Sequence, residues 1–413
     1  MLWLSQVLSA IGDQLHSLAV IWISIQIGGA KAGFVAAAGT TAGIVVGLFA
    51  GVYADRWNRR SAMIAVDALR AVAVLVLAVV AQSGQLQLWQ MAVVAVVVSA
   101  LGSLFNPCMT ASLPALVSQP ENLRAITALM IMTFRIARLV GPGIAAVVLA
   151  YLPISAFFVI DSASYVVSAL AIWSLGTKYM WRPQQASTAA GVRGIMLDLS
   201  LSARLVAKNP QLAFNLSLCL FEPGLWCAAY LVGLPLMIKH AAFGSSDTSV
   251  TAYATIICAY GFGNVSSLVA LGTRVLHKRA GFFSGVGITI MGVGFLFLSF
   301  APNLFLACIA AAFAAAGGPI ADLAMTQLLQ HFPDEYRGKL NSLRFFLSGL
   351  GAAVGLGTAP FLFATVNSTA GVAICARCML SLGLIGMAFG PAFDRHRQLR
   401  TVDGVGFILE PEA

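Results

Sequence analysis

The chain has 413 residues, of which 59% are hydrophobic and 9% are charged, and its formal net charge is +9. An average soluble domain carries roughly 25% charged residues, so this chain lacks the charge to cover a water-facing surface and we expect lipid around it. The net charge of +9 does not indicate a nucleic-acid partner, because the basic residues gather in the loops between apolar runs, where membrane topology places them.

Apolar runs long enough to cross a membrane follow one another along the whole chain. A spanning helix needs about 20 apolar residues, and the sequence predicts twelve of them. The first six cover residues 2–27, 33–54, 61–82, 87–109, 122–149 and 153–176. The other six cover residues 210–238, 249–271, 281–300, 303–329, 338–364 and 369–392. We therefore expect an all-α membrane protein with twelve transmembrane helices in two six-helix bundles.

A polar stretch divides these spans into two sets. The sequence predicts an N-terminal bundle (1–176), a central loop (177–209), a C-terminal bundle (210–392) and a tail (393–413). Nearly all Lys and Arg residues outside the spans fall on the side of the central loop and tail, and only Lys31 and Lys239 fall on the other. The positive-inside rule then places both termini and the central loop in the cytoplasm.

Acidic residues inside the spans are the first candidates for function. Each costs roughly 2.5–3.5 kcal/mol on insertion scales, and five occur: Asp13, Asp67, Asp161, Glu222 and Asp322. Asp13 and Glu222 lie about halfway along the first and seventh spans, at corresponding places in the two halves. A carboxyl group in a low-dielectric cavity can exchange a proton near neutral pH, so both are candidates for proton coupling or substrate binding. The alternative is a carboxyl group that serves packing alone.

Two neighbouring features modify this hypothesis. His16 lies three residues after Asp13 on the same helix face, and such a pair can hold a proton, or a metal ion if further ligands converge. Pro223 follows Glu222 and predicts a break or kink that exposes backbone carbonyls beside the acid. In the third span, Asp67 and Arg70 are spaced to neutralise each other, or they bridge to the charged loop before this span. The aromatic residues expected to line the cavity are Trp22, Phe221, Trp226 and Tyr230.

A charged loop between the second and third spans carries the clearest motif. Gly51 is followed by Asp55, Arg56, Arg59 and Arg60. A topology anchor explains the arginines but not the glycine or the acid. The pattern Gly-x-x-x-Asp-Arg-x-x-Arg-Arg resembles the loop between the second and third helices of major facilitator transporters. The resemblance implies a cytoplasmic gate motif whose acidic partners are Asp334, Glu335 or Glu121.

The second half repeats this layout. Gly272, Arg274, Lys278 and Arg279 follow its second span as a degraded copy of the motif. Two sets of six spans with matching loops are typical of a transporter built from parallel repeats, with substrate held near mid-membrane between the halves. Glycines four residues apart predict close helix contact at the seam between the halves. They are Gly39, Gly43, Gly47 and Gly51 in the second span and Gly351 and Gly355 in the eleventh.

The fifth span contains two arginines and a predicted kink. Gly141, Pro142 and Gly143 resemble the Gly-Pro motif in the fifth helix of drug–proton antiporters. Arg138, one turn before the kink, can pair with a membrane acid or meet an anionic substrate. The alternative is a structural role, in which Arg138 forms an ion pair that only holds the helices of the bundle together.

The resemblance extends over nearly the whole chain. Residues 8–13, 105–107, 138–142 and 333–339 are similar to the bacterial drug–proton antiporter branch that includes macrolide and enterobactin exporters. This implies a monomeric transporter of the bacterial inner membrane that exports an amphiphilic drug or siderophore by alternating access, with protons as coupling ion. The alternatives are export of a metal ion or chelate, as in ferroportin, with Asp13 and His16 as ligands, or lysophospholipid transport. We expect no cofactor and no enzymatic activity, because no nucleotide-binding Gly-x-x-x-x-Gly-Lys motif occurs.

Overall fold

The chain folds into two compact units, residues 1–193 and 194–413. The structure is a computed structural model that describes residues 2–113, 126, 129–130, 133, 137, 141, 144–145, 148, 151–175, 200, 202–240, 246–272, 274–394, 396–402 and 406–411. The division between the units falls inside the stretch 177–209, where the sequence predicts the central loop.

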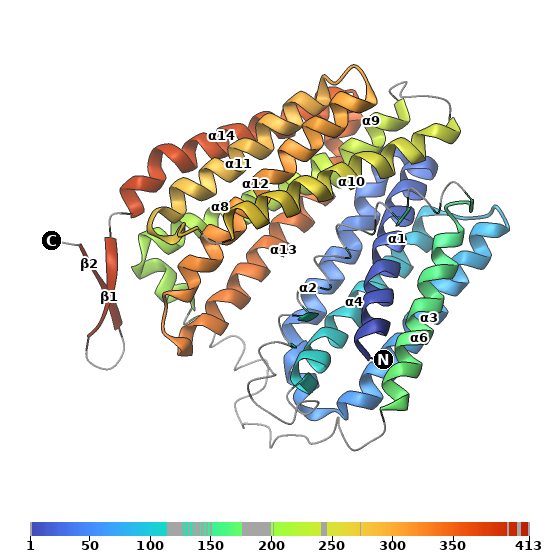
Figure 1. Ribbon diagram of the computed structural model, residues 1–413, viewed down its shortest axis with the longest axis horizontal. Coiled ribbons are helices and arrows are strands. Elements are labelled where there is room, and N and C mark those ends of the chain that lie inside the picture. The colour runs from blue at the N-terminus through green and yellow to red at the C-terminus, as the bar shows by residue number, and fades with distance from the viewer. Residues whose placement is uncertain are drawn as a thin grey trace. The chain divides into compact units, whose positions relative to one another are not determined.

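The N-terminal unit is built from long helices (Figure 1). They are α1 (Leu2–Gly28), the 3-10 turn η1 (Gly29–Lys31), α2 (Ala32–Arg56), α3 (Arg59–Gln82), α4 (Leu88–Ser112) and α6 (Ala156–Ser174). Helix α2 packs on α4, α4 on α3, α3 on α6, and α6 on α1. Of the predicted fifth span, the described residues from 126 to 148 are helical.

The C-terminal unit repeats this construction (Figure 1). Its elements are α8 (Pro210–Cys227), the π-helical segment η3 (Ala228–Gly233), α9 (Leu234–His240), α10 (Ser246–Leu271), η4 (His277–Arg279), α11 (Ala280–Ser299), α12 (Leu304–Gln330), α13 (Asp334–Thr365) and α14 (Ser368–Asp394). Helices α14, α11, α12 and α10 lie side by side in this order, and α8 packs on α13 and α14.

The two units share one pattern of neighbours. The second helix of each packs on the fourth, as α2 does on α4 and α10 on α12. The third packs on the sixth, as α3 does on α6 and α11 on α14, and the first also packs on the sixth. This shared pattern confirms the predicted pair of pseudo-symmetric bundles.

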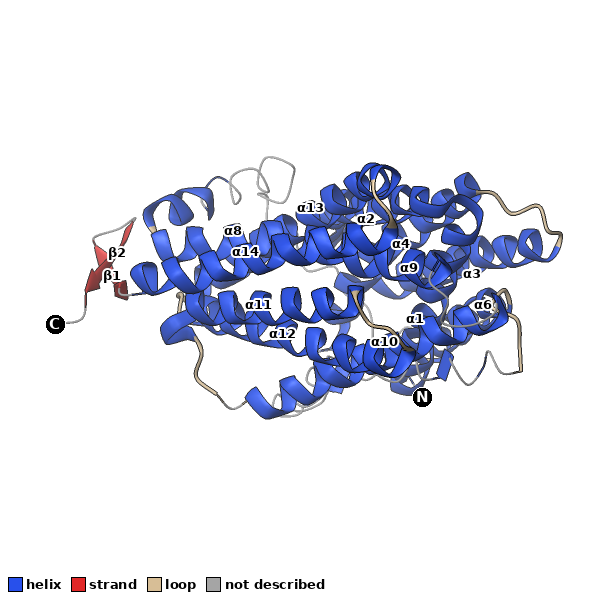
Figure 2. Ribbon diagram, turned by 90° about the horizontal axis from the view of Figure 1, so that it is seen from above, coloured by secondary structure: helices blue, strands red, loops and turns tan. Residues whose placement is uncertain are grey.

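The helices are long and apolar enough to cross a membrane. Ten such stretches occur in the described residues, and the first, Trp3–Ala50, contains both α1 and α2. With the helical residues of the fifth span, they support the predicted set of twelve. Figure 2 shows the one departure from an all-α chain among the described residues, a hairpin in the tail formed by β1 (His396–Val402) and β2 (Gly406–Pro411). The sequence predicted a tail at this place, without strands.

Asparagine residues fix where several helices begin. The Asn58 side chain accepts a hydrogen bond from Ser61 N at 3.2 Å, Asn209 from Leu212 N at 3.0 Å, and Asn303 from Leu306 N at 2.9 Å. Each satisfies a backbone N–H that the first helical turn leaves without a partner. Helices α3, α8 and α12 therefore start directly after their caps.

Glycines bring α13 against α8. A Cβ on Gly351 would lie 1.8 Å from the Leu220 carbonyl oxygen, and one on Gly355 would lie 2.1 Å from that of Gly224. In the N-terminal unit, Gly39 and Gly43 face Ala95 and Ser99 of α4 in the same way. Within each unit, these glycines pack against helices of the same unit. Their predicted place at the seam between the halves stays a prediction.

Candidate functional site

Charged groups from three helices, some buried and some half-buried, form a cluster in the N-terminal unit. Asp13 and His16 come from α1, Asp67 and Arg70 from α3, and Asp161 from α6. Asp67 is 1% exposed and Asp161 is fully buried. Arg70 contacts Asp67, and its positive charge acts at longer range on Asp13 and Asp161. Among the described residues, three carboxyl groups and one guanidinium therefore lie near one another.

Arg70 is held by more than its charge. Its Nε and Nη2 donate to the Val98 carbonyl oxygen at 3.3 and 3.2 Å, and its guanidinium lies 5.1 Å from the centre of the Tyr165 ring. Its Nη1 is 4.0 Å from Asp67 Oδ1. The predicted Asp67–Arg70 pair is therefore long, because Arg70 lies among several partners.

Asp13 contacts α6 through Tyr165. The Tyr165 hydroxyl donates a hydrogen bond to Asp13 Oδ1 at 2.5 Å, and the tyrosine is fully buried. A phenol can donate to either a carboxylate or the carbonyl oxygen of a neutral carboxyl group. Asp13 thus keeps a hydrogen-bond partner in both protonation states.

His16 contacts a different acid from the predicted one. Its Nδ1 lies 3.2 Å from Asp161 Oδ2, and its ring meets Phe158 edge-on at 5.6 Å. The predicted partner was Asp13, one turn earlier on α1. Both side chains face α6, and each finds its own partner there.

The α6 residues were missed as a group, although the sequence carried a signal. Asp161, Ser164, Tyr165 and Ser168 are spaced i, i+3, i+4 and i+7, so they share one face of an otherwise apolar helix. Ser168 accepts from Gln6 Nε2 of α1 at 2.9 Å, and Ser164 donates to the Asp161 carbonyl oxygen. This polar face is the side of α6 that packs on α1.

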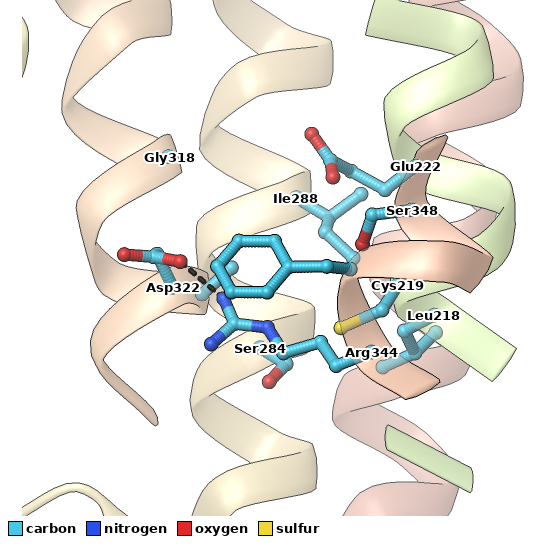
Figure 3. A pocket seen from close by; sticks show the side chains of 11 residues that line it. Leu218, Cys219, Glu222, Ser284, Ile288, Gly318, Asp322, Arg344 and Ser348 are labelled. Carbon is cyan, nitrogen blue, oxygen red and sulfur yellow. Dashed lines mark hydrogen bonds and ion pairs between the residues drawn. The ribbon is translucent and has the colours of Figure 1, made fainter. Parts of the chain in front are cut away.

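A cavity of 220 Å³ lies in the C-terminal unit (Figure 3). It is lined by Leu218, Cys219, Glu222, Ser284, Ile288, Gly318, Ala321, Asp322, Arg344, Phe345 and Ser348. Arg344 Nη2 forms an ion pair with Asp322 Oδ1, and its Nη1 donates to Thr326 Oγ1 at 2.9 Å. Glu222 lines the same cavity from α8, so the structure places this predicted site residue beside a carboxylate and a guanidinium that the sequence had not joined to it.

The aromatic residues expected at a cavity between the halves do not line this cavity of the C-terminal unit. Phe345 lines it, whereas Trp226 and Tyr230 stack on each other with ring centres 5.0 Å apart. Trp226 Nε1 also donates to Tyr260 Oη at 2.8 Å. The polar ends of these large rings therefore satisfy one another within the unit.

Of the predicted break or kink at Pro223, the break does not occur. Helix α8 runs through it to Cys227, and the irregular turn comes afterwards, in the π-helical segment η3. Gly224 next to it lets α13 approach, since a Cβ there would lie 2.6 Å from the Gly351 carbonyl oxygen. The tight contact with α13 supports the helix at the proline.

The fifth span is described only at single positions. Gly141 is helical, and a Cβ on it would lie 2.7 Å from Gln14 Cβ of α1. This contact mirrors that of Gly351 and Gly355 with α8 in the other unit. The predicted residues Arg138 and Pro142 lie outside the described residues.

The arginines after α2 bind helix ends of their own unit. Arg59 Nη1 donates to the Ala111 carbonyl oxygen at 2.8 Å, and Arg60 Nη2 donates to that of Trp173 at 2.5 Å. Positive side chains stabilise the carboxyl ends of helices, here α4 and α6. Helix α2 continues through Gly51 and Asp55 to Arg56, and the structure describes no side chains for residues 51–56.

These features are those of a membrane transporter, and comparison with known proteins decides the family. The family model of the Major Facilitator Superfamily matches residues 2–356. The chain belongs to this superfamily. It is therefore a membrane transporter and not an enzyme, as the sequence predicted.

Individual relatives are distant. An uncharacterized MFS-type transporter of Bacillus subtilis (strain 168), YfiS, is 22% identical over 417 residues, which cover 97% of this chain and 95% of the relative. A crystal structure of the nucleoside transporter NupG matches with a TM-score of 0.69 and 14% identity, covering 94% of this chain and 98% of that chain. The peptide transporter POT in complex with sulfate matches with a TM-score of 0.73 and 12% identity, covering 95% of each chain. These similarities establish the fold.

Replacing Arg344 by Gln is expected to lower stability only slightly. The ion pair with Asp322 is lost, but the Asp322 side chain is 53% exposed, so water takes over much of the interaction and the change should be about 0.2–1 kcal/mol. Thermal unfolding of the purified protein in detergent measures it. In the double variant Arg344→Gln/Asp322→Asn, the loss of stability should be smaller than the sum of the losses in the two single variants. A loss equal to that sum would contradict the pairing.

Proposed function

We propose that this transporter exports an amphiphilic small molecule by alternating access, driven by protons. The observation that carries this proposal is the cluster in which Asp13, Asp67 and Asp161 lie around Arg70 inside the N-terminal unit. The outward direction and the drug or siderophore class rest on the resemblance of the sequence to drug–proton antiporters.

The cluster suits proton binding for an electrostatic reason. Ionised carboxyl groups lose hydration in a buried site, and like charges near one another oppose ionisation. Three acids around one arginine therefore favour the binding of protons by these carboxyl groups. A conformational change that moves Asp13 away from the other acids would favour release of its proton. Asp13 lies on α1, the helix that packs against α6 through Tyr165, so its proton is linked to a contact between helices.

The cavity in the C-terminal unit supports an amphiphilic substrate. Leu218, Ile288 and Phe345 offer apolar contact, while Glu222 and Arg344 offer charge. A volume of 220 Å³ is below the roughly 300–1,000 Å³ of small-molecule pockets, so the cavity would hold one part of a substrate. Glu222 would bind a proton or a cationic group of that part.

The alternative substrates gain no support from the described residues. His16 pairs with Asp161, and no three His, Cys, Asp or Glu side chains described in the structure are grouped to hold a metal ion. Nothing in the described cavity favours a lysophospholipid over another amphiphile. The relatives named for nucleosides and peptides share the fold at 12–14% identity, so we carry neither substrate to this chain.

Orientation and gating belong to the same proposal. The basic central loop and tail would face the cytoplasm of a bacterial inner membrane, with the transporter acting as a monomer. The loop motif would form a cytoplasmic gate in which Asp55 and Arg56 act together with Arg59 and Arg60. The hydrogen bonds of Arg59 and Arg60 to α4 and α6 would anchor this gate to its own unit.

Asp13→Asn is expected to reduce proton-coupled transport strongly. Macrolides, dyes and siderophores would be added to proteoliposomes that hold an imposed pH gradient. The movement of protons into the medium would then be measured. Wild type should move protons with at least one compound, and Asp13→Asn should reduce this by about tenfold or more, the factor given by a change of about 1.4 kcal/mol. Glu222→Gln tests the corresponding site of the other unit.

The control is Asp394→Asn, which replaces a buried acid at the end of α14 that accepts hydrogen bonds from Gln211 and Gly281. It should keep proton coupling. Gradient-driven transport that survives both Asp13→Asn and Glu222→Gln would remove these two acids from the mechanism. Transport by wild type that ignores the gradient would overturn the proposed function.

A further inference from the structure

Two buried atoms that face each other lack a hydrogen-bond partner. His16 Nδ1 and Asp161 Oδ2 are 3.2 Å apart, and neither atom has a hydrogen bond within the described part of the chain. His16 is 6% exposed and Asp161 is fully buried. Buried polar atoms without a hydrogen-bond partner are rare, so two of them facing each other need an explanation.

We propose that His16 and Asp161 form a proton-binding pair, separate from Asp13 and Tyr165. In the neutral tautomer that carries its hydrogen on Nε2, Nδ1 presents a lone pair to the carboxylate oxygen, so both atoms are acceptors. A proton added at Nδ1 turns the contact into a donor and an acceptor and places opposite charges 3.2 Å apart.

The charged groups around the pair come from each neighbouring helix. Asp13 lies one turn before His16 on α1, and Asp67 and Arg70 approach from α3. Tyr165 approaches from α6. The described residues of α4 include no acid, lysine, arginine or histidine, and Arg135 and Arg138 of the fifth span lie outside the description. Burial and Arg70 oppose a positive charge on His16, while the negative charge of an ionised Asp161 would favour it, so the pair responds to the charge state of the nearby acids.

This inference rests on the proposed proton coupling and adds a second proton to it. Asp13 has its own hydrogen-bond partner in Tyr165, so a proton on Asp13 occupies a different site from a proton held between His16 and Asp161. Protons on Asp13 and on His16 would together offset the excess of three acids over Arg70. A cluster filled in this way would carry about two protons in each transport cycle.

Nuclear magnetic resonance of the imidazole nitrogens tests the pair without a substrate. The full chain, labelled with ¹⁵N-histidine, would be placed in lipid nanodiscs and followed from mildly alkaline to acidic pH. The His16 signal is assigned by its loss in His16→Gln. We expect it to change from the neutral to the imidazolium pattern within this range in wild type, and Asp161→Asn to displace that transition by at least about tenfold in proton concentration.

Two controls make the result specific. Asp394→Asn, which removes a buried acid of the other unit, should leave the His16 transition where it was. Elution as a single symmetric peak establishes that each variant is folded. A His16 signal that keeps one protonation state throughout, or a transition that Asp161→Asn does not displace, would overturn the proposed pair.

Failure of this inference differs from failure of the proposed function. If His16 does not titrate but proteoliposomes still couple transport to Asp13, the pair is wrong and the proposed function stands. If His16 titrates with Asp161 while transport ignores the pH gradient, the pair stands as a proton site and proton-driven export is wrong.

Discussion

Replacing Arg70 by Gln is expected to destabilise the protein by about 3–5 kcal/mol, the typical loss when one partner of a buried ionic group is removed. The Arg70 side chain is 11% exposed, so water cannot replace it beside Asp13, Asp67 and Asp161. The variant also loses the two hydrogen bonds to Val98 and the contact with the Tyr165 ring. Thermal and denaturant unfolding in detergent measure the change.

Arg344→Gln is the matched control for Arg70→Gln. Both arginines are 11% exposed and each contacts an acid, but the partner of Arg344 is half exposed and that of Arg70 is buried. The control should therefore lose much less stability. Adding Asp67→Asn to Arg70→Gln should restore part of the loss, because one fewer buried charge lacks a partner. Equal losses in the two arginine variants would show that the N-terminal cluster does not depend on Arg70.

The spans could be predicted because each depends on local sequence alone. A run of about 20 apolar residues is long enough to cross a bilayer whatever its neighbours are. The same reasoning found the acids, since Asp13, Asp161 and Glu222 are unusual in apolar surroundings. It also found the repeated layout, because the loop after α2 resembles the loop after α10. The hairpin of the tail was not predicted, because runs of apolar residues reveal membrane spans but not the pairing of strands outside them.

Partners across helices could not be predicted in the same way. The sequence shows that Asp13 and His16 share a face, but not that Tyr165 and Asp161 stand opposite them on α6. Which residues face each other depends on how α1 and α6 are rotated about their axes and shifted along them. Packing of many side chains determines both. The helical spacing of polar residues on α6 could have revealed its polar face. In contrast, nothing in the sequence indicates that Asp322 of α12 pairs with Arg344 of α13.

The direction of a glycine face is equally a property of packing. Spacing of four residues predicts a smooth face for close helix contact, and this holds for Gly351 and Gly355. The sequence leaves open which neighbour the face meets. In the structure the neighbour is α8, whose own Gly224 completes the contact, so the first and fifth helices of this unit approach closely at the level of Glu222.

Gly351→Ala is expected to lower stability by about 1–3 kcal/mol, the usual penalty of overpacking. The new Cβ would lie 1.8 Å from a backbone oxygen of α8, which cannot move without displacing the helix that carries Glu222. Gly357→Ala on the same helix is the control: its Cβ would meet nothing within 4 Å, and alanine favours a helix over glycine by about 1 kcal/mol, so stability should hold or rise. The change in stability of Gly141→Ala should lie between those of the other two variants, because the new Cβ would meet the side chain of Gln14 and not backbone. Unfolding midpoints of the three variants measure this order, and a Gly351→Ala protein as stable as Gly357→Ala would contradict the close packing of α13 on α8.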